Sequence, residues 1–342
     1  MLDRQLLHIR GNFPDLPRRA IQFFDVSNAS AGSNGMIGRT AMEFATSVQI
    51  PNPALESTHQ MPAIHLVTAI LNRMVDVGVL MRRGIVDDFI NTRYLYFRGH
   101  DQWSDIIDFV VYGFPSIIDA YDKSILQVIA HCEGNQASGT CFVSSANGLL
   151  TAAHCVATAP QLEIVGLKKA DLIGARIFLA RSQTADCAFI GLPNPLLSDR
   201  RTPHWGDANI LEDIVLLGYP NIPTLLSVRI AEKANVSTIL RGAVASKVGD
   251  IFGSELLLIT APVRGGFSGG PVINNSGVTV GMISRQPFPQ LDQSEIQRYD
   301  AAGFGLAIPR IVLAKFMEAI ENNDITTIEE RDQGSFEWVD GS

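Results

Sequence analysis

Three short segments in the second half of the chain carry residue types that catalyse nucleophilic reactions. His154 lies in LTAAHCV, Asp186 in TADCAFI, and Ser268 in the glycine-rich segment RGGFSGGPV. A serine hydroxyl becomes an effective nucleophile only when a base takes its proton, and an imidazole suits that task near neutral pH. A carboxylate can fix the imidazole tautomer and stabilise the imidazolium. The glycines around Ser268 let amide N–H groups turn toward a developing oxyanion.

Taken together and in this order, the three segments resemble the chymotrypsin-like, trypsin-fold serine proteases. TAAHC at 151–155 matches the histidine box of that family, Asp186 opens a D-x-A-hydrophobic pattern, and GFSGGP at 266–271 matches G-x-S-G-G-P. GFGLAIP at 303–309 is similar to the HtrA-like branch of the family. The resemblance spans roughly residues 125–320.

The resemblance implies a role for each of these residues. Ser268 is the expected nucleophile, His154 the general base and acid, and Asp186 the group that orients the imidazole. The backbone N–H groups of Gly266 and Ser268 form the expected oxyanion hole. The implied reaction passes through an acyl-enzyme that water hydrolyses, and it uses no metal and no organic cofactor.

The substrate pocket is partly predicted by the same resemblance. Pro262, Arg264, Ser284 and Arg285 are its expected residues, with Ser284 near the buried aspartate. The wall around Pro262 is apolar except for Arg264, so we expect a small or aliphatic residue at the cleaved position. Phe267 stands where animal trypsins carry an aspartate that pairs with a newly cut N-terminus, so activation by propeptide cleavage is not expected. Only a short stretch follows the last predicted helix, so a PDZ module after the protease domain is not expected.

The elements that must position these residues lie in a chain whose two halves differ in sequence pattern. Residues 1–100 form an expected recognition or regulatory domain, 101–124 a helical connector, 125–322 the protease domain, and 323–342 an acidic flexible tail. From residue 125 onward, short apolar runs separated by Gly, Asn, Pro and Asp predict many short strands. The resemblance makes these strands a double six-stranded Greek-key β-barrel, closed by a helix over 309–323. The expected fold class is a mainly β C-terminal domain with a small, mainly α N-terminal domain.

The N-terminal hundred residues predict helices followed by a hairpin. Apolar spacing predicts helices over 16–25, 36–47 and 62–77, and alternation predicts strands over 79–83 and 93–99. This order resembles a winged helix-turn-helix domain, although no diagnostic motif supports it. Helix 62–77 would then enter a DNA groove. Its outer face offers only Arg73 as a base, so protein recognition is favoured over DNA binding.

Charge and hydropathy exclude several classes of protein. The 342 residues carry a net charge of −8, with +2 in residues 1–100 and therefore −10 in the rest. This balance argues against a general polyanion-binding protein. The first twenty residues lack the apolar run of a secretory signal, and no stretch approaches the ~20 apolar residues that span a bilayer. A cytoplasmic protein without membrane contact is expected.

The four cysteines lack any CxxC pair, so their spacing predicts no structural zinc site. Cys155 follows His154 at a position where many secreted relatives carry a disulfide. Cys141 lies close to the partner position but is offset from it by two residues. In a reducing cytosol, free buried thiols are favoured over a bridge between these two cysteines.

The sequence as a whole predicts an intracellular serine endopeptidase that cleaves a protein substrate. Its N-terminal domain is expected to regulate it through a protein partner, in stress response or in bacterial defence against phage. Two other interpretations stay open. The chain could be a DNA-binding regulator with an attached protease, or a pseudoprotease scaffold. The sequence leaves open whether the resting active site is formed.

Overall fold

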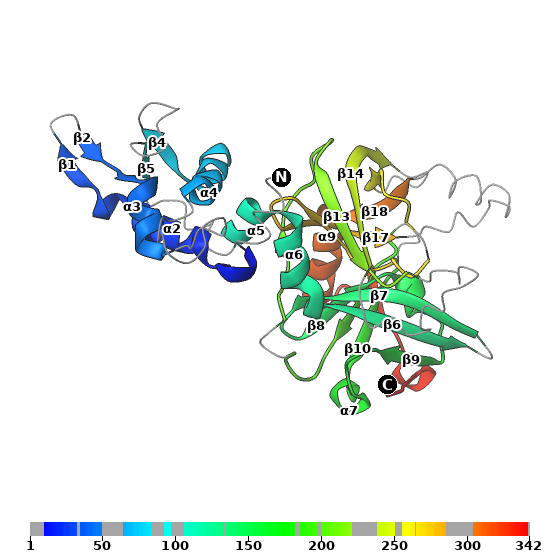
Figure 1. Cartoon of the computed structure of the whole chain (residues 1–342). Coiled ribbons are helices and arrows are strands. Elements are labelled where there is room, and N and C mark those ends of the chain that lie inside the picture. Colours follow the sequence, from blue (N-terminus) through cyan, green and yellow to red (C-terminus); the bar gives the residue numbers. More distant parts are fainter. Residues whose placement is uncertain are drawn as a thin grey trace, which may run out of the picture. The chain divides into compact units, whose positions relative to one another are not determined.

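The computed structural model of the protein describes residues 10–32, 35–49, 64–83, 92–96, 106–132, 135–181, 185–196, 200–220, 238–249, 255–263, 265–284 and 304–340. The chain forms two compact units, Met1–Ile117 and Ile118–Ser342 (Figure 1). Each unit has its own hydrophobic core.

The first unit packs helices against a small antiparallel sheet of strand order β3-β5-β4. Its core gathers Phe24, Phe44, Met74 and Tyr94, with the rings of Phe24 and Tyr94 5.5 Å apart. Its elements are α2 (Leu16–Phe24), η1 (Val26–Asn28), β1 (Ser30–Gly32), β2 (Gly35–Ile37), β3 (Arg39–Thr40), α3 (Ala41–Val48), α4 (Ile64–Asp76), β4 (Met81–Arg83), β5 (Arg93–Leu95) and α5 (Ile107–Tyr112).

Most of the elements predicted here are confirmed, with two corrections. The helix predicted over 36–47 begins only at Ala41, because Thr40 caps it: its hydroxyl accepts a hydrogen bond from the Glu43 N–H, and the Glu43 carboxylate accepts one from the Thr40 N–H. The residues before it form β2 and β3 instead. The first part of the predicted connector also differs, because α5 contributes Ile107 and Val111 to the core of this unit.

The second unit contains two β-sheets, each built around six strands in Greek-key order. In the first sheet β9 returns beside β6, and in the second β16 returns beside β13. The first sheet uses β6 (Ile125–Cys132), β7 (Asn135–Ser145), β8 (Gly148–Thr151), β9 (Gln161–Ile164), β10 (Arg176–Ala180) and β11 (Ala188–Gly191). The second uses β13 (Asp213–Gly218), β14 (Thr238–Gly249), β15 (Glu255–Ile259), β16 (Pro271–Asn274), β17 (Val278–Ser284) and β18 (Gly305–Pro309), with β12 (His204–Trp205) added at β17.

Short helices complete the second unit. The strands are preceded by α6 (Phe114–Tyr121) and η3 (Asp122–Ser124), and interrupted by η4 (Ala153–Cys155) and α7 (Lys169–Leu172). The predicted closing helix is confirmed as α9 (Arg310–Glu321), which buries Leu313, Phe316 and Ala319.

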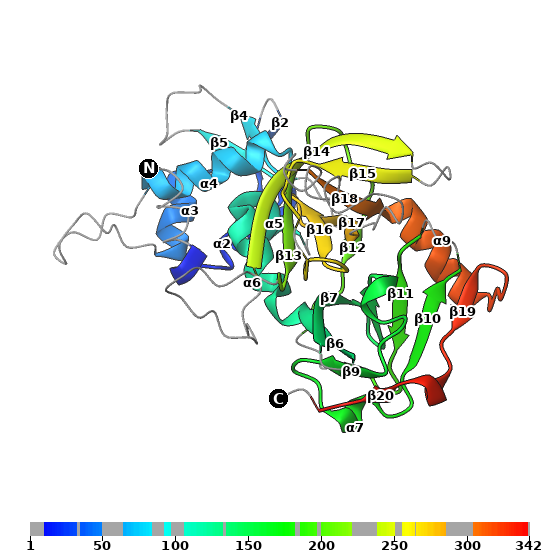
Figure 2. The same cartoon turned by 90° about the vertical axis from the view of Figure 1, so that its right-hand side faces the viewer.

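The two sheets close differently. The second is a closed six-stranded barrel, because β17 pairs with both β16 and β18. The first is open between β9 and β10 among the described strands, so the predicted pair of closed barrels is shown only in part. Its two edges carry strands from the end of the chain: β19 (Ile328–Glu330) pairs with β10, and β20 (Glu337–Trp338) pairs with β9 (Figure 2).

The predicted flexible tail is therefore wrong for most of its length. Residues 324–340, here called the C-terminal segment, run from β19 through η5 (Gln333–Ser335) to β20. Ile328 and Trp338 are buried, and Trp338 belongs to the core of the first sheet. Apolar side chains set between acidic ones give this segment enough surface to bury, although its average composition is polar.

Candidate active site

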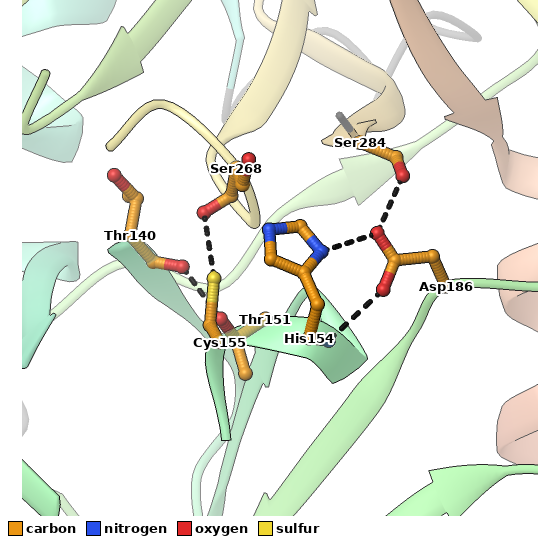
Figure 3. Close-up of polar contacts among 7 residues, drawn as sticks. All are labelled: Thr140, Thr151, His154, Cys155, Asp186, Ser268 and Ser284. Carbon is orange, nitrogen blue, oxygen red and sulfur yellow. Dashed lines mark hydrogen bonds and ion pairs between the residues drawn. The ribbon is translucent and has the colours of Figure 1, made fainter. Parts of the chain in front are cut away.

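The pairing of β8 with β11 brings His154 and Asp186 together. The strands run antiparallel with Thr151 opposite Ala188, so the residues after β8 and those before β11 leave the sheet at the same end. His154 lies in η4, and its Nδ1 is 2.7 Å from Asp186 Oδ2. The backbone N–H of His154 donates to Asp186 Oδ1 at 3.0 Å. One carboxylate therefore holds both the ring and the backbone of the histidine (Figure 3).

Ser284 adds a third contact to this carboxylate. Its hydroxyl donates to Asp186 Oδ2 at 2.6 Å from the end of β17, and the side chain is buried. Ser284 was predicted to be a pocket residue near the aspartate, and its hydroxyl faces the carboxylate. The second barrel thus helps to orient a carboxylate that belongs to the first sheet.

These contacts favour the charged form of His154. Burial lowers the pKa of the imidazole, but the hydrogen bond and charge of Asp186, with contributions from Cys155, outweigh burial and raise the pKa to about 10. The side chain of His154 is 38% exposed, whereas that of Asp186 is 12% exposed. An imidazolium is therefore well stabilised in the resting chain, and the share of neutral imidazole that can accept a proton as a general base increases as pH rises toward 10.

Ser268 lies in the loop between β15 and β16, two strands of the second barrel. The loop has positive φ at Gly266 (+96°) and Gly269 (+86°). A Cβ at Gly269 would lie 2.1 Å from the backbone oxygen of Thr140, so no larger residue fits there. Phe267 anchors the loop in the core of the second barrel. Ser268 itself is only 2% exposed.

The imidazole lies between Asp186 and Ser268, as Figure 3 shows. The contact with the carboxylate is made, whereas no hydrogen bond joins the Ser268 hydroxyl to the His154 ring in the described part of the site. Such contacts often tighten only when substrate binds. The structure thus joins His154 to Asp186 and places Ser268 on the other side of the imidazole.

The predicted oxyanion hole and pocket are only partly described. Gly266 and Ser268 are both buried, and neither backbone N–H is paired with a backbone carbonyl among the residues described around this loop. Pro262 lies at the surface. Arg264 and Arg285 lie outside the described residues.

The cysteine beside the histidine is unbridged. Cys141 and Cys155 are both free and buried. A Cβ on Gly139 would lie 2.5 Å from the Cys155 sulfur, so Gly139 occupies the position that a disulfide partner would take. This explains the offset of two residues at Cys141. The Cys155 thiol instead lies 3.7 Å from the backbone oxygen of Ser268. In the part of the chain that is described, no three His, Cys, Asp or Glu side chains gather as a metal site would require.

Sequence reasoning missed one residue that contacts the loop around Ser268, residues 265–271, here called the nucleophile loop after the role that the sequence predicts for Ser268. Thr140 hydrogen-bonds the loop on both sides of Phe267, through its hydroxyl to Gly266 and through its N–H to Ser268. Thr140 lies in the middle of β7, in the segment GTCFVSS, and only its position beside Gly139 could have drawn attention to it.

Comparison with known proteins gives one family match. The model of the trypsin-like peptidase domain matches residues 139–282, which include His154, Asp186 and Ser268. No curated protein matches the sequence. Solved structures to which the chain is similar include the active form of the Rv3671c protease from M. tuberculosis (18% identity, covering 59% of this chain and 82% of that chain, TM-score 0.44). They also include the serine endoprotease from Yersinia pestis (16% identity, 61% of this chain, 66% of that chain, TM-score 0.44) and the HtrA-type protease AlgW with a decapeptide (15% identity, 61% of this chain, 67% of that chain, TM-score 0.43). Among the described helices, none has the length and hydropathy needed to cross a membrane.

Proposed function

Residues 139–282 are a trypsin-like peptidase domain, and from this we propose that the protein is a serine endopeptidase whose triad is Ser268, His154 and Asp186. The observation that supports the triad assignment is the pair of hydrogen bonds between Asp186 and His154. The carboxylate binds the ring at 2.7 Å and the histidine backbone at 3.0 Å, and it accepts a further hydrogen bond from Ser284. A carboxylate held in this way fixes the tautomer that leaves Nε2 facing the nucleophile.

The reaction then follows from the roles of the groups. Ser268 Oγ attacks the peptide carbonyl while His154 Nε2 takes its proton, and the carbonyl oxygen gains a negative charge. The N–H groups of Gly266 and Ser268 donate to that oxygen. The imidazolium gives its proton to the leaving amine as the C–N bond breaks, which leaves an acyl-enzyme. Water, deprotonated by His154, then attacks the acyl carbon and releases Ser268.

The test is labelling with a fluorophosphonate, which reacts with an activated serine. We expect full-length protein to gain one adduct at Ser268, read by intact mass and peptide mapping. Ser268→Ala should lose the adduct while melting within a few degrees of the wild type, since it opens no large cavity. His154→Ala should also lose the adduct, and it should melt at a lower temperature because the ion pair with Asp186 is gone. Labelling at full rate in His154→Ala would show that the triad assignment is wrong. A folded wild type that never labels and never cleaves, yet binds a partner, would favour the pseudoprotease scaffold.

We also propose that the first unit is a winged-helix domain that regulates the protease by binding a protein. Its helices and three-stranded sheet follow the order α2-β3-α3-α4-β4-β5, with η1 and the hairpin β1-β2 inserted after α2, and the sheet order β3-β5-β4 supports a winged helix. Arg73, the base on the outer face of α4, donates to the Val110 carbonyl at 3.2 Å within the same unit. This contact supports protein recognition over the DNA-binding alternative.

Binding of duplex DNA tests the two alternatives for the first unit. We expect the full-length protein to show no binding to mixed-sequence duplexes even at low salt, where phosphate contacts are strongest. Salt-dependent binding that disappears in Arg82→Ala, a β4 variant, would favour the DNA-binding regulator instead.

We also propose that the protein is cytoplasmic, which the unbridged Cys141 and Cys155 support. We further propose that it prefers a small or aliphatic residue at the cleaved position.

A further inference from the structure

Thr140, on β7, holds the loop that presents Ser268. Its hydroxyl donates to the Gly266 carbonyl at 2.6 Å, and its backbone N–H donates to the Ser268 carbonyl at 2.8 Å. The same hydroxyl accepts a hydrogen bond of 3.0 Å from the backbone N–H of Tyr219. The side chain is fully buried. One residue therefore binds the nucleophile loop at two carbonyls that lie two residues apart.

These two carbonyls flank the groups that the proposed reaction uses. The Gly266 carbonyl belongs to the peptide unit between Gly266 and Phe267, and the Ser268 carbonyl to the unit that follows the nucleophile. The intervening unit is held by the Gly270 N–H, which donates to the Phe267 carbonyl at 2.9 Å. With all three units fixed, the direction of the Ser268 N–H is determined. The Gly266 N–H is the adjoining donor, and the positive φ of Gly266 leaves this residue free to turn if its carbonyl is released.

The surrounding packing is built to admit the threonine. A Cβ on Gly218 would lie 2.8 Å from the Thr140 hydroxyl, and a Cβ on Gly269 would lie 2.5 Å from the Thr151 hydroxyl. Thr151 in turn donates to the Thr140 carbonyl at 2.7 Å, which fixes the backbone of Thr140 from the other side. Every polar group of Thr140 thus has a partner, and two glycines give the space that these partners need.

We propose that Thr140 is a positioning residue for the oxyanion hole, and that its hydroxyl holds the Gly266–Phe267 peptide in the orientation that catalysis needs. This inference rests on the proposed function. It makes the nucleophile loop depend on a hydroxyl from the first sheet, whereas the loop itself belongs to the second barrel. Loss of the hydroxyl leaves the Gly266 carbonyl and the Tyr219 N–H without their partner.

Three variants of the full-length protein test it. Thr140→Val keeps the shape and removes the hydroxyl, and Thr140→Ser keeps the hydroxyl. Ser138→Ala is the matched control: it removes another β7 hydroxyl, which bonds Gln127 and the Tyr219 carbonyl but does not contact the nucleophile loop. Hydrogen–deuterium exchange of residues 265–271 measures how firmly the loop is held, whether or not the protein is catalytically active. The rate of fluorophosphonate labelling, measured against pH, reports its use in the reaction.

We expect Thr140→Val to exchange roughly 10-fold faster in residues 265–271 and to label about 10- to 100-fold more slowly than wild type. The pH midpoint of labelling should stay at the wild-type value, because the contacts between His154 and Asp186 are untouched. Thr140→Ser and Ser138→Ala should behave as wild type in both measurements.

Two results would overturn the inference. One is wild-type exchange in Thr140→Val, and the other is a Thr140→Ser variant as impaired as Thr140→Val, since shape rather than the hydroxyl would then matter. A shifted pH midpoint in Thr140→Val would also count against it, because the effect would then reach His154. If no chain labels but exchange still rises in Thr140→Val alone, the positioning role stands and the proposed function fails.

Discussion

Replacing Arg331 with methionine tests whether the C-terminal segment stabilises the loop that follows His154. Arg331 lies between β19 and β20, and only 7% of it is exposed. Its guanidinium donates to the Val156 carbonyl, and to the Ala159 carbonyl at 2.6 Å. It also binds Ser335 within the segment. A single side chain thus ties the end of the chain to the backbone just beyond the proposed base.

The expected cost follows from these contacts. Methionine fills the space of the arginine stem but leaves two carbonyls without partners, at about 1–3 kcal/mol each. The guanidinium also stacks on Phe336 at 4.6 Å, which adds about 0.5–1 kcal/mol. Against this, burial of the cation is unfavourable, as the lowered pKa of Arg331 indicates, and the substitution removes that penalty. The net loss should be about 2–4 kcal/mol, a fall in Tm of roughly 5–15 °C for a unit of this size.

The assay is thermal unfolding followed by circular dichroism, with Arg176→Met as the matched control. Arg176 binds Glu330 of the same segment, but its side chain is 52% exposed, and exposed pairs contribute only about 0–1 kcal/mol. Arg331→Lys should recover little, because an ammonium cannot span two carbonyls as the planar guanidinium does. If Arg331→Met and Arg176→Met had the same melting temperature, the reasoning that the C-terminal segment stabilises the loop after His154 would be refuted.

Two further predictions concern the catalytic centre. Gly269→Ala places a Cβ 2.1 Å from the Thr140 carbonyl oxygen at a φ of +86°, so we expect a loss of more than about 3 kcal/mol in urea unfolding, whereas Gly249→Ala, with nothing within 4 Å of its Cβ, should be neutral. The pKa of His154 rises from 6.5 to about 10 on folding, so its charge stabilises the fold fully below pH 6.5 and this contribution is lost as pH rises through 10. The difference in unfolding free energy between wild type and His154→Gln should therefore shrink across that range, and a constant difference would contradict the ion pair.

The strands of the second unit were predictable where they are apolar. The apolar runs that begin at residues 125, 141, 148, 175, 187 and 214 correspond to β6, β7, β8, β10, β11 and β13. The long strand β14 was not predicted, because Arg241 and Lys247 interrupt its apolar pattern and much of it faces solvent. Pattern thus identifies strands that are buried on both faces more readily than strands at the surface.

Contacts that depend on register could not be predicted from the motifs. The three motifs name His154, Asp186 and Ser268, and the resemblance also implies that Ser284 lies near the aspartate, as it does. The hydrogen bonds of Thr140 to the Gly266 and Ser268 carbonyls depend instead on how the first sheet meets the second barrel, which the motifs do not contain. The C-terminal segment was misjudged for a related reason. Its average composition is acidic, whereas its structure depends on a few residues, Ile328, Arg331 and Trp338, that find partners far away in sequence.

The structure divides the proposed chemistry between two sets of contacts. Asp186, Ser284 and the backbone of η4 fix the acid–base pair, and their hydrogen bonds are complete in the resting chain. The nucleophile loop depends instead on Thr140 and on glycines at positive φ. The Ser268 hydroxyl that it carries makes no hydrogen bond to the imidazole in the described part of the site. A ligand shifts a conformational equilibrium only by the difference in its affinity for the two states. Since the acid–base pair is already assembled, a regulator of this protease would act most effectively on the loop that carries Ser268.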